Sequence, residues 1–242
     1  LLKMFRIFQY ENEWNIIYYP SKPSGFSIMI IGDHHHFVNN SDSYWLQHPI
    51  RYGCIDKWME QGYTCFSSNF KGKHWGNDAV VSFTQRFYNT VMKNEILNEK
   101  IHIFAEGKGA LIALKLAFSM KAKIRSIVLL NPCLSIKDIW KQEKERKIFY
   151  KQFLNEMSNA YGKTKEEMRF LYKDMDRTRE LISIPIKIIE IVDHKEKNKH
   201  LQIQQLRKRN QDQTKVVYLL PEQRYKISTE TYRFIKRFEN VL

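Results

Sequence analysis

Residues 101–114 read Ile-His-Ile-Phe-Ala-Glu-Gly-Lys-Gly-Ala-Leu-Ile-Ala-Leu. Residues 100–104 are mostly apolar and β-branched or aromatic, which is typical of a buried strand, and residues 110–120 form an apolar stretch typical of a buried helix. Between them, Gly107 and Gly109 permit a sharp turn with backbone angles that other residues rarely adopt. This segment therefore predicts a strand, a tight turn and a helix, the repeating unit of a parallel sheet.

Strands and helices alternate on both sides of this unit. The flanking apolar patterns predict strands over 4–9, 13–19, 27–31, 63–67, 127–130, 186–192 and 216–220, and helices over 49–61, 80–93, 199–209 and 229–238, the last with Ser228 as its N-cap. Parallel strands joined by helices need right-handed crossovers. We therefore predict an α/β fold with a mainly parallel eight-stranded sheet and helices on both faces. The segment 136–182 contains no predicted strand, and we interpret it as a helical insertion in a single domain, 1–242.

The composition is that of a globular protein. The chain has 242 residues, of which 43% are hydrophobic and 27% are charged, so wholesale disorder is excluded. No apolar run reaches the roughly 20 residues that a membrane-spanning helix needs. The three cysteines, Cys54, Cys65 and Cys133, are scattered and form no CxxC pair. They favour a reducing compartment inside the cell, either the cytoplasm or an organelle matrix such as that of a mitochondrion.

The chain is strongly basic and its charge is uneven. Lys and Arg number 40 against 26 acidic residues, a net charge of +14. The segment 194–212 is the most one-sided and contains Lys195, Lys197, Lys199, Arg207, Lys208 and Arg209. Basic surfaces attract phosphate groups, so RNA or an anionic membrane surface is one candidate partner. The alternative is a solvated face in a lysine-rich sequence.

Several segments, in their order along the chain, resemble the α/β-hydrolase fold family. Residues 101–114 are similar to its nucleophile elbow, and Ile30-Ile-Gly-Asp-His34 stands where the family has the loop after its third strand. Residues 60–76 resemble the next strand and its loop, residues 184–193 resemble the strand that carries the acid, and 136–182 takes the place of the lid. The resemblance covers about residues 13–238 and implies the same fold.

The resemblance breaks at the catalytic residues. The family needs a nucleophile within Gly-x-Ser-x-Gly and a histidine after the last strand. This turn reads Ala105-Glu106-Gly107-Lys108-Gly109, so Gly107 stands at the nucleophile position without a side chain. No histidine follows His200, and the acid survives at most as Asp193, or as His194 one residue on. We therefore expect a pseudoenzyme that acts as a binding, scaffold or structural subunit of a larger protein complex, with no cofactor.

Two alternatives to this interpretation remain open. One is an esterase-like or thioesterase-like hydrolase with a rearranged site, whose nucleophile would be Cys65, Ser67, Ser68 or Cys133, near the ends of predicted strands. No general base is placed beside any of them in the sequence. The other is a basic protein that associates with nucleic acid or an anionic membrane.

The remaining candidate site residues lie around the elbow. Asp33, His34 and His36 belong to a polar cluster on the loop beside it, and His34 and His36 could share a side of an extended chain. A metal site there would need further ligands such as His74, His102 or Asp193, and we favour a polar loop without metal. Gly107 and Lys108 open a helix that could bind an anion. The alternative is that small residues at this turn let the helix pack closely on the sheet.

Overall fold

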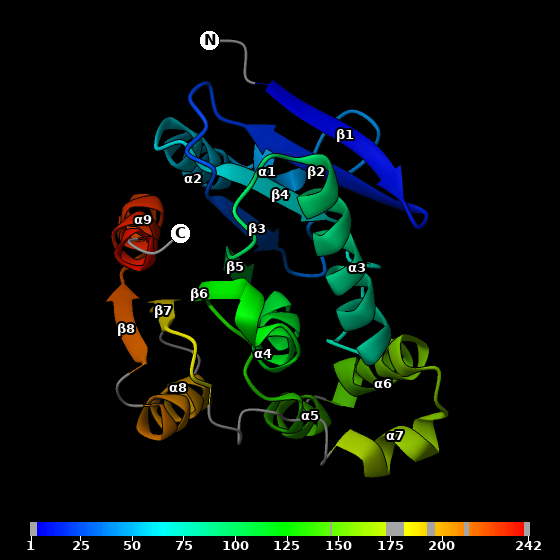
Figure 1. Ribbon diagram of the computed structural model, residues 1–242. Coiled ribbons are helices and arrows are strands. Elements are labelled where there is room, and N and C mark those ends of the chain that lie inside the picture. Colours follow the sequence, from blue (N-terminus) through cyan, green and yellow to red (C-terminus); the bar gives the residue numbers. More distant parts are fainter. Residues whose placement is uncertain (1–3, 146, 173–181, 193–196, 211–212, 240–242) are drawn as a thin grey trace.

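A computed structural model describes residues 4–145, 147–172, 182–192, 197–210 and 213–239 (Figure 1). Its strands are β1 (Met4–Tyr10), β2 (Glu13–Tyr19), β3 (Ser27–Ile31), β4 (Thr64–Ser68), β5 (Ile101–Glu106), β6 (Ile124–Leu130), β7 (Ile186–Ile191) and β8 (Thr214–Leu219). They form an eight-stranded sheet in the order β1-β2-β4-β3-β5-β6-β7-β8. Strand β2 is antiparallel to β1 and β4, and the other neighbours pair in parallel. The predicted fold class is confirmed.

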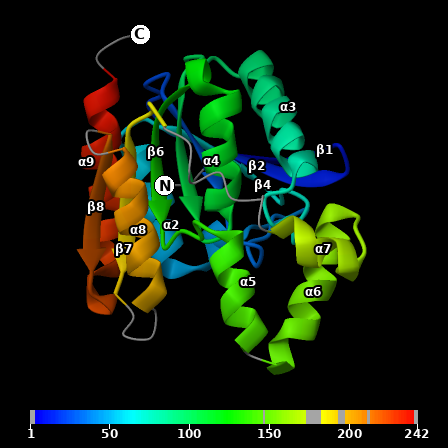
Figure 2. The same ribbon diagram turned by 90° about the horizontal axis from the view of Figure 1, so that it is seen from below.

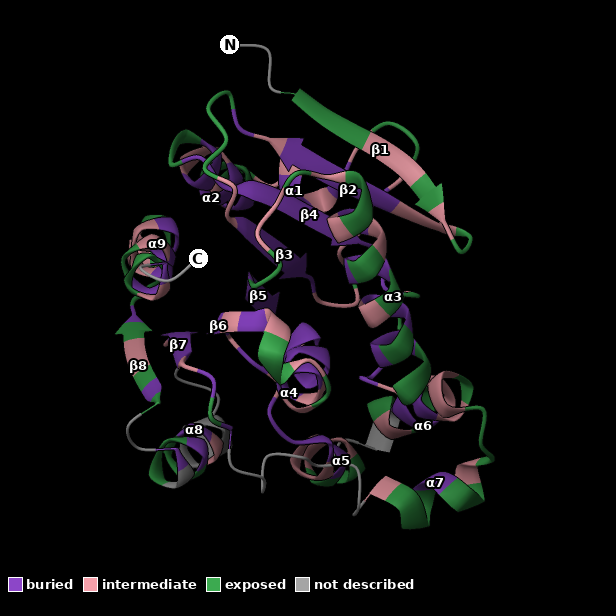
Figure 3. Cartoon of the chain, viewed as in Figure 1, coloured by how far each residue is buried: buried purple, intermediate pink, exposed green. Residues whose placement is uncertain are grey.

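Helices cover both faces of the sheet. They are α1 (Tyr44–Gln47), α2 (Pro49–Glu60) and α9 (Ile227–Ile235) on one face, and α3 (Asp78–Asn94), α4 (Gly109–Ser119) and α8 (Lys197–Arg209) on the other (Figure 1). Because side chains alternate along a strand, Ile103 and Ala105 join the core beneath α3 and α4, whereas Phe104 joins the core beneath α2 and α9. The central strands are therefore buried on both sides (Figure 3).

The predicted insertion is helical where it is described. Helices α5 (Ile136–Glu145), α6 (Lys147–Tyr161) and α7 (Lys165–Leu171) lie together at one end of the molecule (Figure 2). Their apolar side chains form a small core with Trp75 and Leu111 of the main body. Phe149 does not belong to this core, since it lies in α6 with 58% of its surface exposed. Residues 173–181 of the insertion lie outside the described residues.

The last helix begins earlier than predicted. A 3₁₀ helix, η3 (Pro221–Lys226), leads directly into α9, and Lys226 occupies the N-cap position without a side-chain hydrogen bond. The prediction that Ser228 is an N-cap is wrong, since Ser228 is buried inside α9. The preceding 3₁₀ turn already supplies hydrogen-bond partners for the first amides of the helix, so no side-chain cap is required. Within the described ranges, no helix has both the length and the apolar character that crossing a bilayer requires.

Candidate functional site

The elbow has the sharp strand-to-helix geometry predicted for it. Strand β5 ends at Glu106, Gly107 has a φ of +55°, and α4 begins at Gly109. The turn is held from the neighbouring strand, because the Gly107 amide donates to the Leu130 carbonyl at 3.0 Å and the Cys133 amide donates to the Gly107 carbonyl at 2.8 Å. A Cβ on Gly109 would lie 2.4 Å from the Ile31 carbonyl oxygen. Small residues are thus required here for close packing of α4 on the sheet.

The Asp33 carboxyl group takes the space of the missing nucleophile side chain. Asp33 lies in the loop after β3, and a Cβ built on Gly107 would be 2.4 Å from Asp33 Oδ2. Asp33 Oδ1 also accepts a hydrogen bond from the Lys108 backbone amide at 3.3 Å. In the resembled family, the amide of the residue after the nucleophile helps to stabilise the oxyanion. Asp33 therefore occupies both the nucleophile position and one donor of the oxyanion hole.

Asp33 is held in its charged form. Its Oδ1 accepts hydrogen bonds from the His34 backbone amide at 2.8 Å and pairs with His34 Nδ1 at 3.0 Å. Burial raises the pKa of the Asp33 carboxyl, but these hydrogen bonds and the charges of His34 and Lys108 outweigh it, and the net pKa lies below the usual value. The elbow thus contains an internal anion near neutral pH.

Lys108 turns its ammonium group toward the same loop. Its Nζ lies 3.5 Å from His34 Nε2 and 3.7 Å from the centroid of the Trp75 ring, a cation–π contact. Burial lowers the pKa of Lys108, and the nearby Asp33 charge acts in the opposite direction. The chain's own Asp33 carboxylate therefore already lies where an anion was predicted to bind at Gly107 and Lys108.

Glu106, the last residue of β5, forms a buried ion pair with Arg51 of α2. Arg51 Nε donates to Glu106 Oε2 at 2.7 Å, and the Arg51 Nη2 donates to Oε1. Burial lowers the pKa of Arg51, but the hydrogen bond and charge of Glu106 raise it above the usual value. Arg51 could not be predicted from the sequence as the partner of Glu106, because 55 positions separate the two residues and no motif connects them. Only the packing of α2 beside the end of β5 brings Arg51 and Glu106 together.

The histidine candidates do not converge on one point. His34 pairs with Asp33. His36 instead stacks on Tyr44, with ring centroids 3.9 Å apart, and its Nε2 lies 3.9 Å from Glu106 Oε2. His74 is buried and its Nδ1 accepts the Gly76 amide at 2.9 Å. His102 lies at the start of β5, away from the elbow, where its Nδ1 is 2.8 Å from Ser126 Oγ. In the described part of the chain, no three His, Cys, Asp or Glu residues are grouped as a metal site would require.

Most of the alternative nucleophiles are inaccessible. Cys65 is fully buried, and burial raises the pKa of its thiol. Ser67 Oγ donates to the Ile30 carbonyl at 2.9 Å inside the sheet, and the buried Ser68 Oγ accepts the Phe70 amide. Cys133 is partly exposed, near the elbow. The structure therefore contradicts Cys65, Ser67 and Ser68 as nucleophiles, since all three belong to a central strand packed on both faces.

Other predicted site residues are described only in part. The segment after β8, where the family places its histidine, is η3, in which Arg224 and Tyr225 are exposed. Arg207 and Lys208 are exposed on α8, to which Lys197, Lys199 and Arg209 also belong. Asp193, His194 and Lys195 lie outside the described residues.

Comparisons with known proteins support the fold and nothing finer. No family model matches the chain, and no curated protein matches its sequence. Among solved structures, it is similar to an S-formylglutathione hydrolase from Agrobacterium tumefaciens, with a TM-score of 0.67, 8% identity and coverage of 98% of this chain and 95% of that chain.

Two further solved structures show the same likeness. One is the fluorophosphonate-binding serine hydrolase F of Staphylococcus aureus, with a TM-score of 0.66, 12% identity and coverage of 98% and 99% of the two chains. The other is an epoxide hydrolase from Solanum tuberosum, with a TM-score of 0.63, 12% identity and coverage of 98% and 100%. The sheet order, the elbow and these likenesses over nearly the whole chain agree: this protein has the α/β-hydrolase fold.

Proposed function

We propose that this protein is a non-catalytic α/β-hydrolase-fold protein that works by binding, as a structural or regulatory subunit of a protein assembly. The observation that carries this proposal is the position of Asp33. Its carboxylate fills the space next to Gly107 and accepts the Lys108 amide. A substrate carbonyl at the elbow would therefore meet a fixed negative charge where the reaction needs a nucleophile and a hydrogen-bond donor.

The rest of the elbow supports the same conclusion. Glu106 is held by Arg51, and Lys108 lies over Trp75 near His34, so the charged groups of this region are engaged with one another. No histidine is available after β8 to serve as a general base, because the chain has none beyond His200. Such an arrangement favours a stable, occupied pocket over one that accepts and releases substrate. The three free cysteines fit a reducing compartment.

The competing function is a hydrolase with Cys133 as its nucleophile. Cys133 is the partly exposed member of the four candidates, and its backbone amide contacts the elbow. The two functions are separated by incubating the full chain with a fluorophosphonate probe, a thiol-reactive probe and simple ester and thioester substrates. We expect no fluorophosphonate labelling and no turnover, whereas labelling of the partly exposed Cys133 by the thiol probe is compatible with the proposal. Turnover that disappears in the Cys133→Ala variant would establish the hydrolase and overturn the proposal.

The assembly is tested by the native size of the protein. In a gently prepared lysate, a subunit should elute well above the 29.2 kDa of the single chain, with partners at a reproducible stoichiometry. The Phe149→Ser and Phe170→Ser variants, which alter exposed apolar side chains of the insertion, indicate whether that surface contributes. Elution of the protein as a monomer, with no partner at fixed stoichiometry, is incompatible with the proposed role.

A further inference from the structure

A basic pocket lies at the opposite end of the sheet from the elbow. Its volume is about 390 Å³, and it is formed where β5 and β6 begin, between the 3₁₀ helices η1 (Lys121–Lys123) and η4 (Lys236–Phe238). Because Lys100 at this pocket immediately precedes β5 and Glu106 at the elbow ends it, the length of the strand separates the two regions. The pocket is thus independent of the Asp33 site.

The charges around this pocket are one-sided. Lys100, Lys121, Arg125 and Arg237 line it, and none of the carboxylates of residues 4–239 that the structure describes does. Two acidic residues adjoin the lining residues in sequence: Glu99 pairs with Lys123 at 2.5 Å, and Glu239 pairs with Lys236 at 2.8 Å. Within the described residues, Lys100, Lys121 and Arg237 form no ion pair. The pocket therefore retains a positive potential that an anionic ligand would neutralise.

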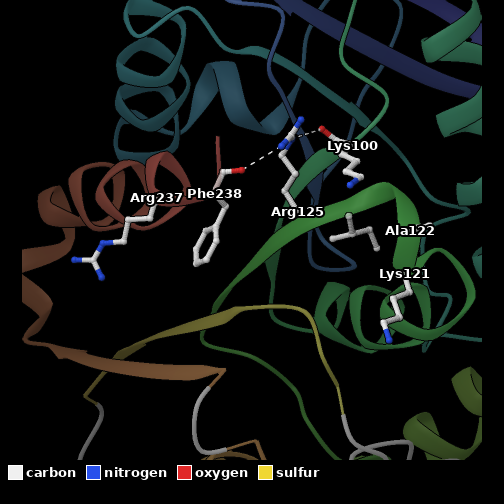
Figure 4. Close-up of a pocket in the computed structure, with 7 residues that line it drawn as sticks. Lys100, Lys121, Ala122, Arg125, Arg237 and Phe238 are labelled. Carbon is white, nitrogen blue, oxygen red and sulfur yellow. Dashed lines mark hydrogen bonds between the residues drawn. The ribbon is translucent and has the colours of Figure 1, made fainter. Parts of the chain in front are cut away.

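Arg125 is held in place at the centre of this group. Its Nε donates to the Lys100 carbonyl at 3.1 Å, and its Nη1 donates to the Phe238 carbonyl at 3.2 Å, as Figure 4 shows. Its guanidinium also lies 5.2 Å from the centroid of the Phe26 ring. These contacts orient the guanidinium through neutral carbonyl acceptors, and the charge of the nearby Glu239 acts against burial, which lowers the pKa of Arg125. A ligand would lose less entropy against such a fixed cation than against a mobile one.

The remaining walls of the pocket are apolar. Phe238, Ala122 and Ile124 line it, and the Phe238 ring packs against Phe234 with centroids 5.1 Å apart. In Figure 4, Arg237 lies on one side of the Phe238 ring and Lys121 lies on the other, beyond Ala122. Both side chains are exposed and have long, flexible stems, so their charged ends can turn toward an anion. The pocket thus combines an aromatic surface with flanking cations.

We propose that this pocket binds a small molecule in which two adjacent phosphate groups are attached to a flat apolar or aromatic group, as in a nucleoside diphosphate. Four basic side chains can neutralise a diphosphate group, and Lys and Arg are the usual partners of phosphate oxygens. The Phe238 ring offers a stacking surface for the flat group. A volume of about 390 Å³ falls in the range of small-molecule pockets.

The proposal is tested by calorimetric titration of the full chain with ADP, inorganic pyrophosphate and adenosine at low ionic strength. We expect ADP to bind, pyrophosphate to bind more weakly and adenosine to bind least. The Lys121→Ala/Arg237→Ala variant should weaken ADP binding by at least roughly tenfold, because charge-assisted hydrogen bonds are lost. The matched control is Lys215→Ala/Arg224→Ala, which removes the same net charge from exposed positions outside the pocket. Its affinity for ADP should stay within about twofold of the unmodified protein.

Three results would overturn the proposal. The first is the absence of ADP binding to the unmodified protein, and the second is an equal loss of binding in both double variants, which would indicate a general charge effect. The third is binding of a single-stranded RNA without binding of ADP, which would indicate a surface that follows a nucleic-acid backbone instead. Because both changed residues of the pocket variant are exposed, an unchanged unfolding midpoint should show that the fold is intact.

Discussion

The Arg51 guanidinium and the Glu106 carboxylate form a buried ion pair directly beside Gly107. Arg51 Nε lies 2.7 Å from Glu106 Oε2, and the second hydrogen bond joins Arg51 Nη2 to Oε1. Because Glu106 immediately precedes the elbow, this pair ties α2 to the turn at the end of β5.

Removing one partner of this pair should destabilise the protein strongly. The Arg51→Met variant leaves the Glu106 carboxylate buried and unpaired, and we expect a loss of about 3–5 kcal/mol in the free energy of unfolding. The Arg51→Met/Glu106→Met variant removes both charges and should recover most of that loss. Urea unfolding of the three proteins measures the difference. Equal destabilisation in the single and double variants would contradict a role for the unpaired charge.

A side chain at position 107 should conflict with Asp33. The Gly107→Ala variant places a side chain on a residue with left-handed backbone angles, which costs on the order of 1–3 kcal/mol of stability. The added Cβ also clashes with Asp33 Oδ2. The Asp33→Ala change removes the carboxyl atoms that clash and leaves only the 3.1 Å contact with the Cβ of residue 33, so the two changes together should cost less than the sum of the single changes. A double-mutant cycle from urea unfolding measures this coupling. Additive effects would mean that Asp33 and position 107 do not share the same space.

Stability should fall as the pH falls below about 6.5, the pKa of histidine in the unfolded chain. Burial lowers the pKa of His74 to about 4 and that of His102 to about 3, the latter also through the charge of Arg125. The unfolded state therefore binds more protons in this range, which favours unfolding. Between pH 7.5 and 5.5 we expect a loss of roughly 1 kcal/mol for each buried histidine.

Urea unfolding at the two pH values tests this expectation. The His102→Gln variant should lose less stability between pH 7.5 and 5.5 than the unmodified protein, because it has no titrating ring at this buried position. The exposed His35 serves as a matched control, and His35→Gln should change the pH dependence much less. An unchanged pH dependence in the His102→Gln variant would show that His102 is protonated equally in both states.

The insertion should depend on Trp140. This side chain is buried, stacks on Tyr172 with ring centroids 4.5 Å apart and contacts Phe153 edge-on. The Trp140→Ala variant removes the centre of the small core formed by α5, α6 and α7, with an expected cost of about 3–5 kcal/mol to the packing of this region. Limited proteolysis should then cut within 136–171 faster than in the unmodified protein, while the sheet stays protected. Uniform cutting throughout the chain would show that the insertion unfolds together with the sheet.

The strand and helix pattern could be predicted because its signals are local. The apolar run of 27–31, the glycines at the elbow and the helical periodicity of 80–93 each depend on neighbouring residues. The observed strands and helices differ from the predicted ones mainly in where they begin and end. Strand β6, for example, begins at Ile124, whereas the predicted strand begins at residue 127. The missing nucleophile at Gly107 could also be recognised, since an elbow is a short continuous segment.

The positions of the side chains around the elbow could not be predicted in the same way. Ser67 lay near the end of a predicted strand and was a plausible nucleophile, but its pairing with Ile30 places the hydroxyl inside the sheet. Similarly, His102 was grouped with the elbow histidines although it lies at the other end of the same strand. Strand pairing and side-chain direction depend on register, which the sequence of one strand does not specify.

By itself, the sequence determined the alternation of strands and helices, the basic charge and the absence of a side chain at Gly107, because these depend on residue type and local order. The tertiary structure decided which group lies against Gly107. Asp33 is 74 positions before Gly107, yet the parallel pairing of β3 with β5 brings its carboxyl group against the elbow. The same holds for Arg51 with Glu106 and for the cations that surround Arg125. Such contacts join residues far apart in the chain, and only the packing of the folded elements selects which of them meet.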